Sequence, residues 1–254
     1  MKKFIVPAFL SMFVMSIFPV VLNAQQDSPL IVVFEEKVAP CDYPQFVQVQ
    51  NEAVDLWKKY QLDVPVYAYQ NDEYAVYWVI FLRNFASLDT LFTKLGQMSA
   101  KMKEDGYDGV AKFRDLSTMS YMVMRWDPEL SYHLHDSFNQ TMDNRYVEWG
   151  FYYMLSGHEQ EASDVVKEFV SFNKEHQSEY SFDTFQVMMG YETPLMIIML
   201  RAENPLAMRT RDKTFMEKHS NRFSELWDKF EVHMRKIENK QGWFVPSFSN
   251  LPSM

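Results

Sequence analysis

The apolar positions of this chain change their spacing in an order that predicts alternating strands and helices. Continuous or alternating apolar runs are typical of strands, and apolar residues three or four positions apart are typical of one helix face. The predicted elements of the first half are a strand at 30–38, a helix at 46–60, a hairpin of strands at 64–70 and 73–82, a helix at 87–104 and a strand at 121–126. Asn71-Asp72 supplies a favourable hairpin turn, and Ser87 supplies a helix N-cap.

The same order of elements returns in the second half. Its predicted elements are a strand at 146–155, a helix through 162–172, a hairpin of strands at 184–189 and 195–202, a helix from Asn204-Pro205 to 237 and a last strand at 243–248. Asn204 followed by Pro205 is typical of a helix start, because proline is well tolerated at the first helical position. The recurrence predicts an internal duplication.

The strand at 73–82 is apolar on both faces, as is the strand at 195–200. Such strands are covered twice, here by helices of their own half and by the sheet of the other half. The predicted fold class is therefore α+β, with two ferredoxin-like βαββα repeats packed sheet to sheet as an intramolecular α/β barrel. The predicted divisions are a signal peptide at 1–24, a first repeat at 25–130, a linker at 131–145 and a second repeat at 146–254.

The doubled element order and the two-faced central strands resemble the dimeric α/β-barrel superfamily. That superfamily includes antibiotic-biosynthesis-type monooxygenases, haem-degrading enzymes, NIPSNAP proteins and, as fused repeats, chlorite dismutase-like proteins. The resemblance spans nearly all of the predicted mature chain and rests on architecture, without a diagnostic motif. It implies a ligand between a sheet and its helices or in the barrel interior. Haem occurs in some members, but no histidine of this sequence stands in a context that marks an axial ligand, so the cofactor stays open.

The N-terminus predicts export. Lys2 and Lys3 precede an uncharged apolar run at 4–21, and Ala24 offers a small residue for cleavage before Gln25. A retained membrane anchor is the alternative, although the run is at the short end for a membrane span. The mature protein is expected to be soluble, periplasmic or secreted, and not inserted in a membrane.

Composition narrows the partners. The formal net charge is −9 and no block of lysine and arginine is present, so neither nucleic acid nor an anionic membrane surface is an expected partner. Cys41 is the only cysteine, which leaves a free thiol and no internal disulfide. It lies before a predicted helix, where a thiol can become reactive, but an incidental thiol is the simpler interpretation.

The candidate ligand-binding residues are Glu148, Tyr152, Arg83, Arg125 and Arg201. Glu148 shares one face of the strand at 146–155 with Tyr152. If that face is buried, the carboxylate needs an arginine partner or a proton, and it could then accept a proton or bind a cationic group. The alternative is a residue at a solvated edge or in a structural ion pair.

His133 and His135 are weak candidates for metal ligands. Two imidazoles at this spacing can share a metal, with Asp136 behind them, but no third ligand has suitable spacing and neither HExxH nor CxxC occurs. The alternative is a polar linker, and no metal site is predicted. GxSxG, GxGxxG and Walker motifs do not occur either.

Three functions therefore stay open. The first is binding of a small apolar or aromatic ligand in the barrel interior, and the second is a barrel oxidoreductase or monooxygenase, haem-linked in one version. The third is a structural or protein-interaction module with a filled core. A binder or enzyme needs a cavity with polar groups converging on it, and a structural module does not. Catalytic residues, oligomeric state and protein partners stay open as well.

Overall fold

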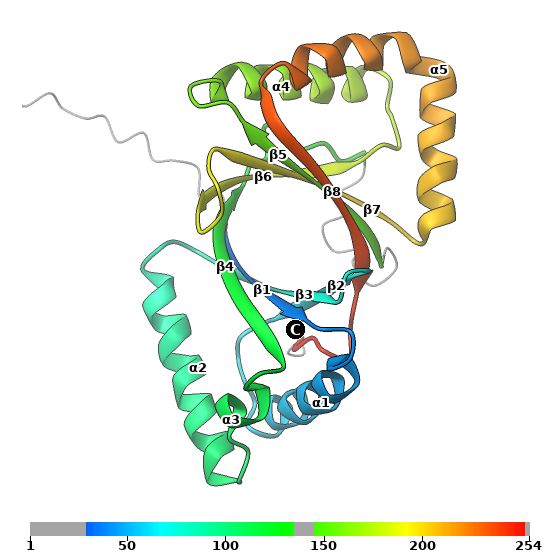
Figure 1. Cartoon of the computed structure of the whole chain (residues 1–254). Coiled ribbons are helices and arrows are strands. Elements are labelled where there is room, and N and C mark those ends of the chain that lie inside the picture. The colour runs from blue at the N-terminus through cyan, green and yellow to red at the C-terminus, as the bar shows by residue number, and fades with distance from the viewer. Residues whose placement is uncertain (1–28, 135–144, 252–254) are drawn as a thin grey trace, which may run out of the picture.

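The computed structural model of the protein describes residues 29–134 and 145–251 (Figure 1). The predicted signal peptide at 1–24 lies outside the described residues, and so does part of the predicted linker. The elements of the first half are β1 Leu30–Val38, α1 Tyr43–Lys59, β2 Tyr67–Asn71, β3 Ala75–Leu82, α2 Ser87–Glu104, α3 Gly109–Phe113 and β4 Ser117–Trp126. Those of the second half are β5 Tyr146–Met154, α4 Glu159–Glu175, β6 Phe182–Met189, β7 Leu195–Ala202, α5 Pro205–Glu231 and β8 Met234–Phe244.

The described strands form one closed barrel in the order β1-β3-β2-β8-β5-β7-β6-β4 (Figure 1). Every neighbouring pair is antiparallel. Within the first half the order is β4-β1-β3-β2, and the second half repeats it as β8-β5-β7-β6. The pairs β2–β8 and β4–β6 join the halves and close the barrel. The predicted α+β barrel is confirmed.

Strand alternation divides the apolar side chains between separate cores. In β3, Tyr77 and Val79 point into the barrel, whereas Trp78 and Ile80 point outward beneath the helices of the first half. A strand needs apolar residues at every position only when both of its faces are covered, as predicted for this segment. Three layers result, because each helix group covers one outer side of the barrel (Figure 1).

The helices begin and end where local chemistry favours it. Asn204 caps α5 by accepting a 2.9 Å hydrogen bond from the backbone nitrogen of Ala207, and Pro205 follows in the first turn, as predicted. α2 begins at Ser87, but its N-cap is Ala86, so the predicted cap by Ser87 is wrong because the first turn starts one residue earlier. Among the described residues, no helix has both the length and the apolar composition needed to cross a bilayer.

The end of the second half differs from the prediction. The last helix was predicted to run to 237 and the last strand to span 243–248, but α5 ends at Glu231 and β8 begins at Met234. Met234 and Ile237 fit a helical stripe as well as a strand face, so periodicity alone misassigned them. β8 pairs with β5 along its length, which satisfies backbone groups that a continued helix would leave open at the barrel wall.

Residues 245–251 return to the first half. The side-chain nitrogen of Asn250 donates hydrogen bonds to the carbonyls of Leu62 and Val64 at 2.9 and 2.8 Å. Phe248 packs against Trp78, with ring centroids 6.1 Å apart. This segment therefore ties the end of the second half to the outer core of the first.

Candidate functional site

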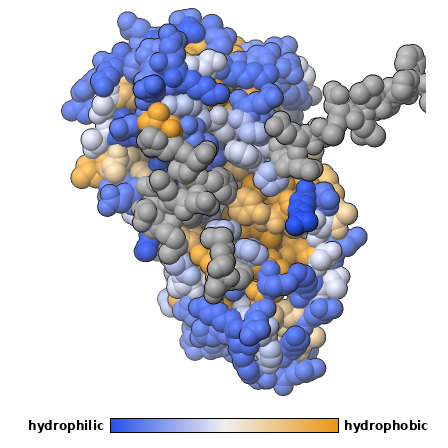
Figure 2. Space-filling model, turned by 180° about the vertical axis from the view of Figure 1, so that it is seen from behind, coloured by the Kyte–Doolittle hydropathy of each residue, from blue (hydrophilic) through white to orange (hydrophobic). Residues whose placement is uncertain are grey.

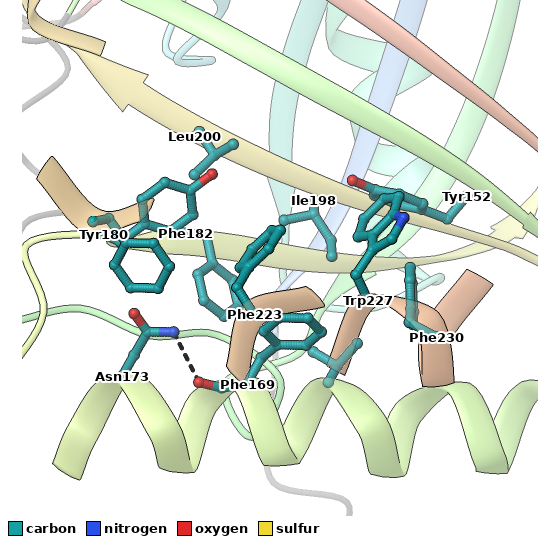
Figure 3. Close-up of a pocket in the computed structure, with 12 residues that line it drawn as sticks. Tyr152, Phe169, Asn173, Tyr180, Phe182, Ile198, Leu200, Phe223, Trp227 and Phe230 are labelled. Atoms are coloured by element: carbon teal, nitrogen blue, oxygen red, sulfur yellow. Dashed lines mark hydrogen bonds between the residues drawn. The ribbon is translucent and has the colours of Figure 1, made fainter. Parts of the chain in front are cut away.

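A cavity of about 80 Å³ lies outside the barrel, between the strands of the second half and helices α4 and α5 (Figure 3). Most of the side chains around it are aromatic. Phe169 comes from α4, Phe223, Trp227 and Phe230 from α5, and Tyr152 from β5. This is the inter-layer position that the superfamily resemblance implies for a ligand.

The spacing of aromatic residues along α5 explains the cavity wall. Phe223, Trp227 and Phe230 are four and three residues apart, so they form one stripe on the helix. They meet other rings edge to face, Phe169 with Phe223 at 5.6 Å and Tyr152 with Phe230 at 5.1 Å between centroids. Flat, rigid rings packed at steep angles leave space that flexible aliphatic side chains would fill.

Asn173 of α4 brings an unmet polar group to this apolar cavity. Its side chain is buried, and its amide nitrogen donates a 2.8 Å hydrogen bond to the carbonyl of Phe169 (Figure 3). The amide oxygen has no hydrogen-bond partner in the described part of the chain. A buried acceptor without a donor costs about 1–3 kcal/mol. A ligand with a donor group would remove that cost.

Two tyrosines add hydroxyl groups to the same cavity. Burial raises the pKa of Tyr152 to about 12. Burial, together with the nearby charge of Asp212, also raises the pKa of Tyr180. Both hydroxyls are therefore protonated at neutral pH and can donate hydrogen bonds. Tyr152 and Glu148 also act electrostatically on Tyr180, so these groups lie near one another. Polar groups thus converge on the cavity, as a binding site requires.

Glu148 points towards α5 and not into the barrel. Its Oε1 atom lies 2.9 Å from a guanidinium nitrogen of Arg209 and accepts a 2.7 Å hydrogen bond from the hydroxyl of Tyr146. The predicted partners were other arginines, because sequence could not show that α5 crosses this face of β5. Arg209 also lies 3.5 Å from Asp212 and so links two carboxylates. Glu148 is therefore in an ion pair with an exposed arginine, and it is not among the residues that line the cavity.

The three predicted arginines lie in different environments. Arg83 is exposed just after β3. Arg125 points outward from β4, with a guanidinium nitrogen 3.3 Å from the sulfur of Met188. Arg201 points into the barrel and donates a 2.6 Å hydrogen bond to Asp183. Of the five predicted residues, only Tyr152 is among the side chains that line the inter-layer cavity.

His133 belongs to the cluster around Asp183 at one end of the barrel. Its Nε2 atom lies 3.0 Å from Asp183 Oδ1, and the indole nitrogen of Trp126 donates to the same oxygen at 3.1 Å. Burial raises the pKa of Asp183, but His133 and Arg201 outweigh this effect and hold that pKa below its usual value. His135 lies outside the described residues. No group of three potential metal ligands occurs among the residues described.

The other end of the barrel holds Glu35, which sequence analysis did not select. Glu35 is 1% exposed and accepts hydrogen bonds from the hydroxyls of Tyr77, at 2.9 Å, and Tyr191. Lys240 lies 3.3 Å from the carboxylate, and the Ser120 hydroxyl lies 3.2 Å from it. A signal was present, because two adjacent glutamates inside an apolar central strand must point to its two faces.

The barrel interior between these two clusters is almost filled. A space of about 50 Å³ remains, with Ile197, Met199 and Trp149 among the side chains around it. Glu35 and Asp183 each accept hydrogen bonds or ion pairs from several neighbouring strands. Each carboxylate therefore holds the strands together at its own end of the barrel. The barrel interior is therefore a packed core with little space for a ligand.

Neither the inter-layer cavity nor the space in the barrel fits a haem. Ligand pockets for molecules of that size are roughly 300–1,000 Å³. The inter-layer cavity is about 80 Å³, and its wall holds no histidine, cysteine or methionine, the axial ligands that most haem proteins use. The space in the barrel is smaller still.

No sequence-family model and no curated protein matches this sequence. Solved structures do match. An anthrone oxidase-like protein shares 11% identity over 87% of this chain and 92% of its own, with a TM-score of 0.58. A monooxygenase-like protein from Lactobacillus acidophilus NCFM shares 12% over 89% and 97%, and one from Fusobacterium nucleatum subsp. nucleatum shares 7% over 86% and 93%, both with TM-scores of 0.51.

These likenesses concern the fold. The chain shares the barrel fold of these solved structures, with both barrel halves in one chain, and the predicted resemblance in architecture is confirmed.

Proposed function

We propose that the protein binds a small planar aromatic molecule, bearing a hydroxyl or amine donor, in the inter-layer cavity of its second half. The observation that carries the proposal is the unpartnered amide oxygen of Asn173 on a cavity wall made mostly of aromatic rings. Ring faces and edges select a planar apolar body. The amide oxygen selects a donor group, as in a phenol.

The size of the cavity restricts the ligand further. An apolar cavity of roughly 150 Å³ holds one benzene molecule. The inter-layer cavity is about half that volume, so binding requires wall rings to move outward. Phe223 and Trp227 can do this because both are only half-buried on α5. The ligand is therefore expected to have one or two rings, and to change the fluorescence of Trp227.

A second candidate function is oxidation of such a bound phenol or related aromatic by dioxygen. It is favoured by the fold shared with oxidase-like and monooxygenase-like proteins and by an apolar cavity that limits water near the ligand. An oxygen electrode with 2-naphthol as the offered substrate tests it. Consumption of dioxygen by the wild-type protein, lost on closing the cavity, would support this candidate, and no consumption above the protein-free rate would reject it.

The binding proposal is tested by calorimetry with 2-naphthol and two variants of adjacent residues. Ile198 lines the inter-layer cavity and Ile197 lines the barrel space, since they point to opposite faces of β7. Ile198→Phe should close the inter-layer cavity and abolish binding, whereas Ile197→Phe should leave binding intact. Both add a ring to a packed region and should cost about 1–3 kcal/mol of stability.

Thermal unfolding of both variants provides the control for folding. Loss of 2-naphthol binding in Ile197→Phe with retention in Ile198→Phe would place the ligand in the barrel instead. No binding to the wild-type protein would reject the proposal.

Export remains part of the proposal. The basic start, the apolar run and Ala24 support cleavage by a signal peptidase before Gln25. Intact mass measurement on the protein recovered from its own cell envelope or medium is the test. A mass that still includes residues 1–24 would reject it.

A further inference from the structure

A second, larger recess adjoins the aromatic cavity. It has a volume of about 650 Å³ and lies between the end of α4, the segment before β6 and the first half of α5. Tyr180 and Phe215 line both spaces. Their rings stack with centroids 5.0 Å apart and form the boundary between the two. A ligand beside this pair can reach both spaces at once.

The recess is basic in an otherwise acidic chain. Arg211 and Lys218 line it, and neither is in an ion pair within the described residues. His176 and His219 line it too, with ring centroids 4.7 Å apart. Glu179 is the acidic residue on its wall. With neutral histidines, the recess carries one net positive charge against −9 for the whole chain.

Arg211 has donor capacity to spare. Its two terminal nitrogens each make one hydrogen bond, to the carbonyl of Arg201 at 2.9 Å and to the sulfur of Met208 at 2.7 Å, although each carries two hydrogens. The guanidinium lies 5.2 Å from the centre of the Tyr180 ring. Its buried Nε atom has no acceptor in the part of the chain that the structure describes. Arg211 is therefore fixed by backbone and ring contacts at the boundary between the recess and the aromatic cavity.

We infer that the recess binds the carboxylate of a ligand whose aromatic body occupies the adjoining cavity. The inference rests on the proposed function and names its ligand class, an aromatic carboxylate. Arg211 and Lys218 supply the charge-assisted hydrogen bonds that a carboxylate accepts. Because Glu179 offsets one of the two positive charges, the net charge of the recess matches a ligand with a single negative charge. This favours a carboxylate over a doubly charged phosphate.

The histidines fit the same role. The Nδ1 atom of His176 is 2.9 Å from the carbonyl of Phe172, which leaves Nε2 facing away from that bond. Burial lowers the pKa of His219, and electrostatic interaction with His176 and Lys218 lowers it further. Because burial is the largest of these effects, His219 is neutral at neutral pH and can donate one hydrogen bond to an anion.

The test compares two ligands of the same shape, 2-naphthoate and 2-naphthamide, by calorimetry on the whole protein. The wild type should bind the charged compound about tenfold more tightly than the neutral one. Lys218→Met and Arg211→Gln should each weaken 2-naphthoate by about tenfold and leave 2-naphthamide unchanged. Lys213→Met is the matched control, because Lys213 is also an α5 lysine but lies outside the recess and pairs with Glu217.

The outcomes separate this inference from the proposed function. If 2-naphthamide binds and 2-naphthoate binds no more tightly, or if Lys218→Met acts like Lys213→Met, the carboxylate site is rejected and the aromatic site stands. If neither compound nor 2-naphthol binds, both are rejected. Because Lys218 is exposed, its replacement should leave the packing of the core unchanged.

Discussion

Glu35 and Glu36 are adjacent in β1, yet their carboxylates lie in two different cores. Glu35 points into the barrel, where tyrosine hydroxyls and Lys240 surround it. Glu36 points outward, where Trp78 donates a 3.1 Å hydrogen bond and the Ser117 hydroxyl lies 2.5 Å away. Burial raises the pKa of both. At Glu35 the surrounding donors and positive charges outweigh burial, so its pKa lies below the ordinary 4.5, whereas that of Glu36 lies above it.

Glu35→Gln should destabilise the protein at neutral pH by about 3 kcal/mol, because it leaves the Lys240 ammonium without its buried carboxylate. Since the folded pKa of Glu35 is below the unfolded one, its stabilisation is present above pH 4.5 and is lost as pH falls through the folded pKa. Urea unfolding across this range should therefore show a weaker acid loss in the variant than in the wild type. Equal acid losses would mean that Glu35 does not contribute to it.

Glu36→Gln should increase the stability of the protein at neutral pH, opposite to the effect of Glu35→Gln. The folded pKa of Glu36 is above the unfolded one, so its ionisation costs stability as pH rises through 4.5 and beyond, and costs nothing where both states are protonated. The variant is expected to be more stable than the wild type at neutral pH and equal to it in acid. Glutamine keeps an oxygen for Trp78, which makes the exchange nearly isosteric. The same urea series measures it, and a loss of stability at neutral pH would contradict it.

Local pattern was sufficient for most of the fold. The bounds of β1, α2 and β7 follow from apolar spacing, and two-faced apolar strands indicated coverage on both sides. β8 was misassigned because Met234 and Ile237 are consistent with both periods, and what decides between them is pairing with β5, about 80 residues earlier.

The site was harder to predict because strand alternation separates two faces without saying which one faces the barrel. Glu148 and Tyr152 were correctly placed on one face of β5, but only the path of α5 shows that this face meets a helix. Arg209 is 61 residues from its partner Glu148, and no local signal connects them. Asn173 was missed for the same reason, since its unmet oxygen is a property of packing.

Arg201→Met should destabilise the protein by about 3–5 kcal/mol, because Asp183 is 1% exposed and would lose a guanidinium 2.6 Å away. The double variant Asp183→Asn, Arg201→Met should lose less than the sum of the single losses, because no charge then stays buried without its partner. Chemical denaturation of the four proteins gives the coupling energy. Additive losses would show that the two side chains stabilise the barrel independently of each other.

Gly150→Ala should lower both the stability of the protein and its affinity for the ligand. The ring of Tyr152 lies over Gly150, and a methyl group there would come within 2.5 Å of its Cε2 and hydroxyl atoms. The ring must then swing away from the strand into the inter-layer cavity. We expect a loss of about 1–3 kcal/mol and weaker 2-naphthol binding.

Gly96→Ala is the matched control, because Gly96 lies in α2 with nothing near the new methyl group. It should stabilise the protein by about 1 kcal/mol, since alanine favours a helix, and should leave 2-naphthol binding unchanged. Adding Tyr152→Leu to Gly150→Ala removes the ring that clashes and should restore part of the lost stability. If Gly150→Ala binds 2-naphthol as the wild type does, the Tyr152 ring does not form the wall that the ligand contacts.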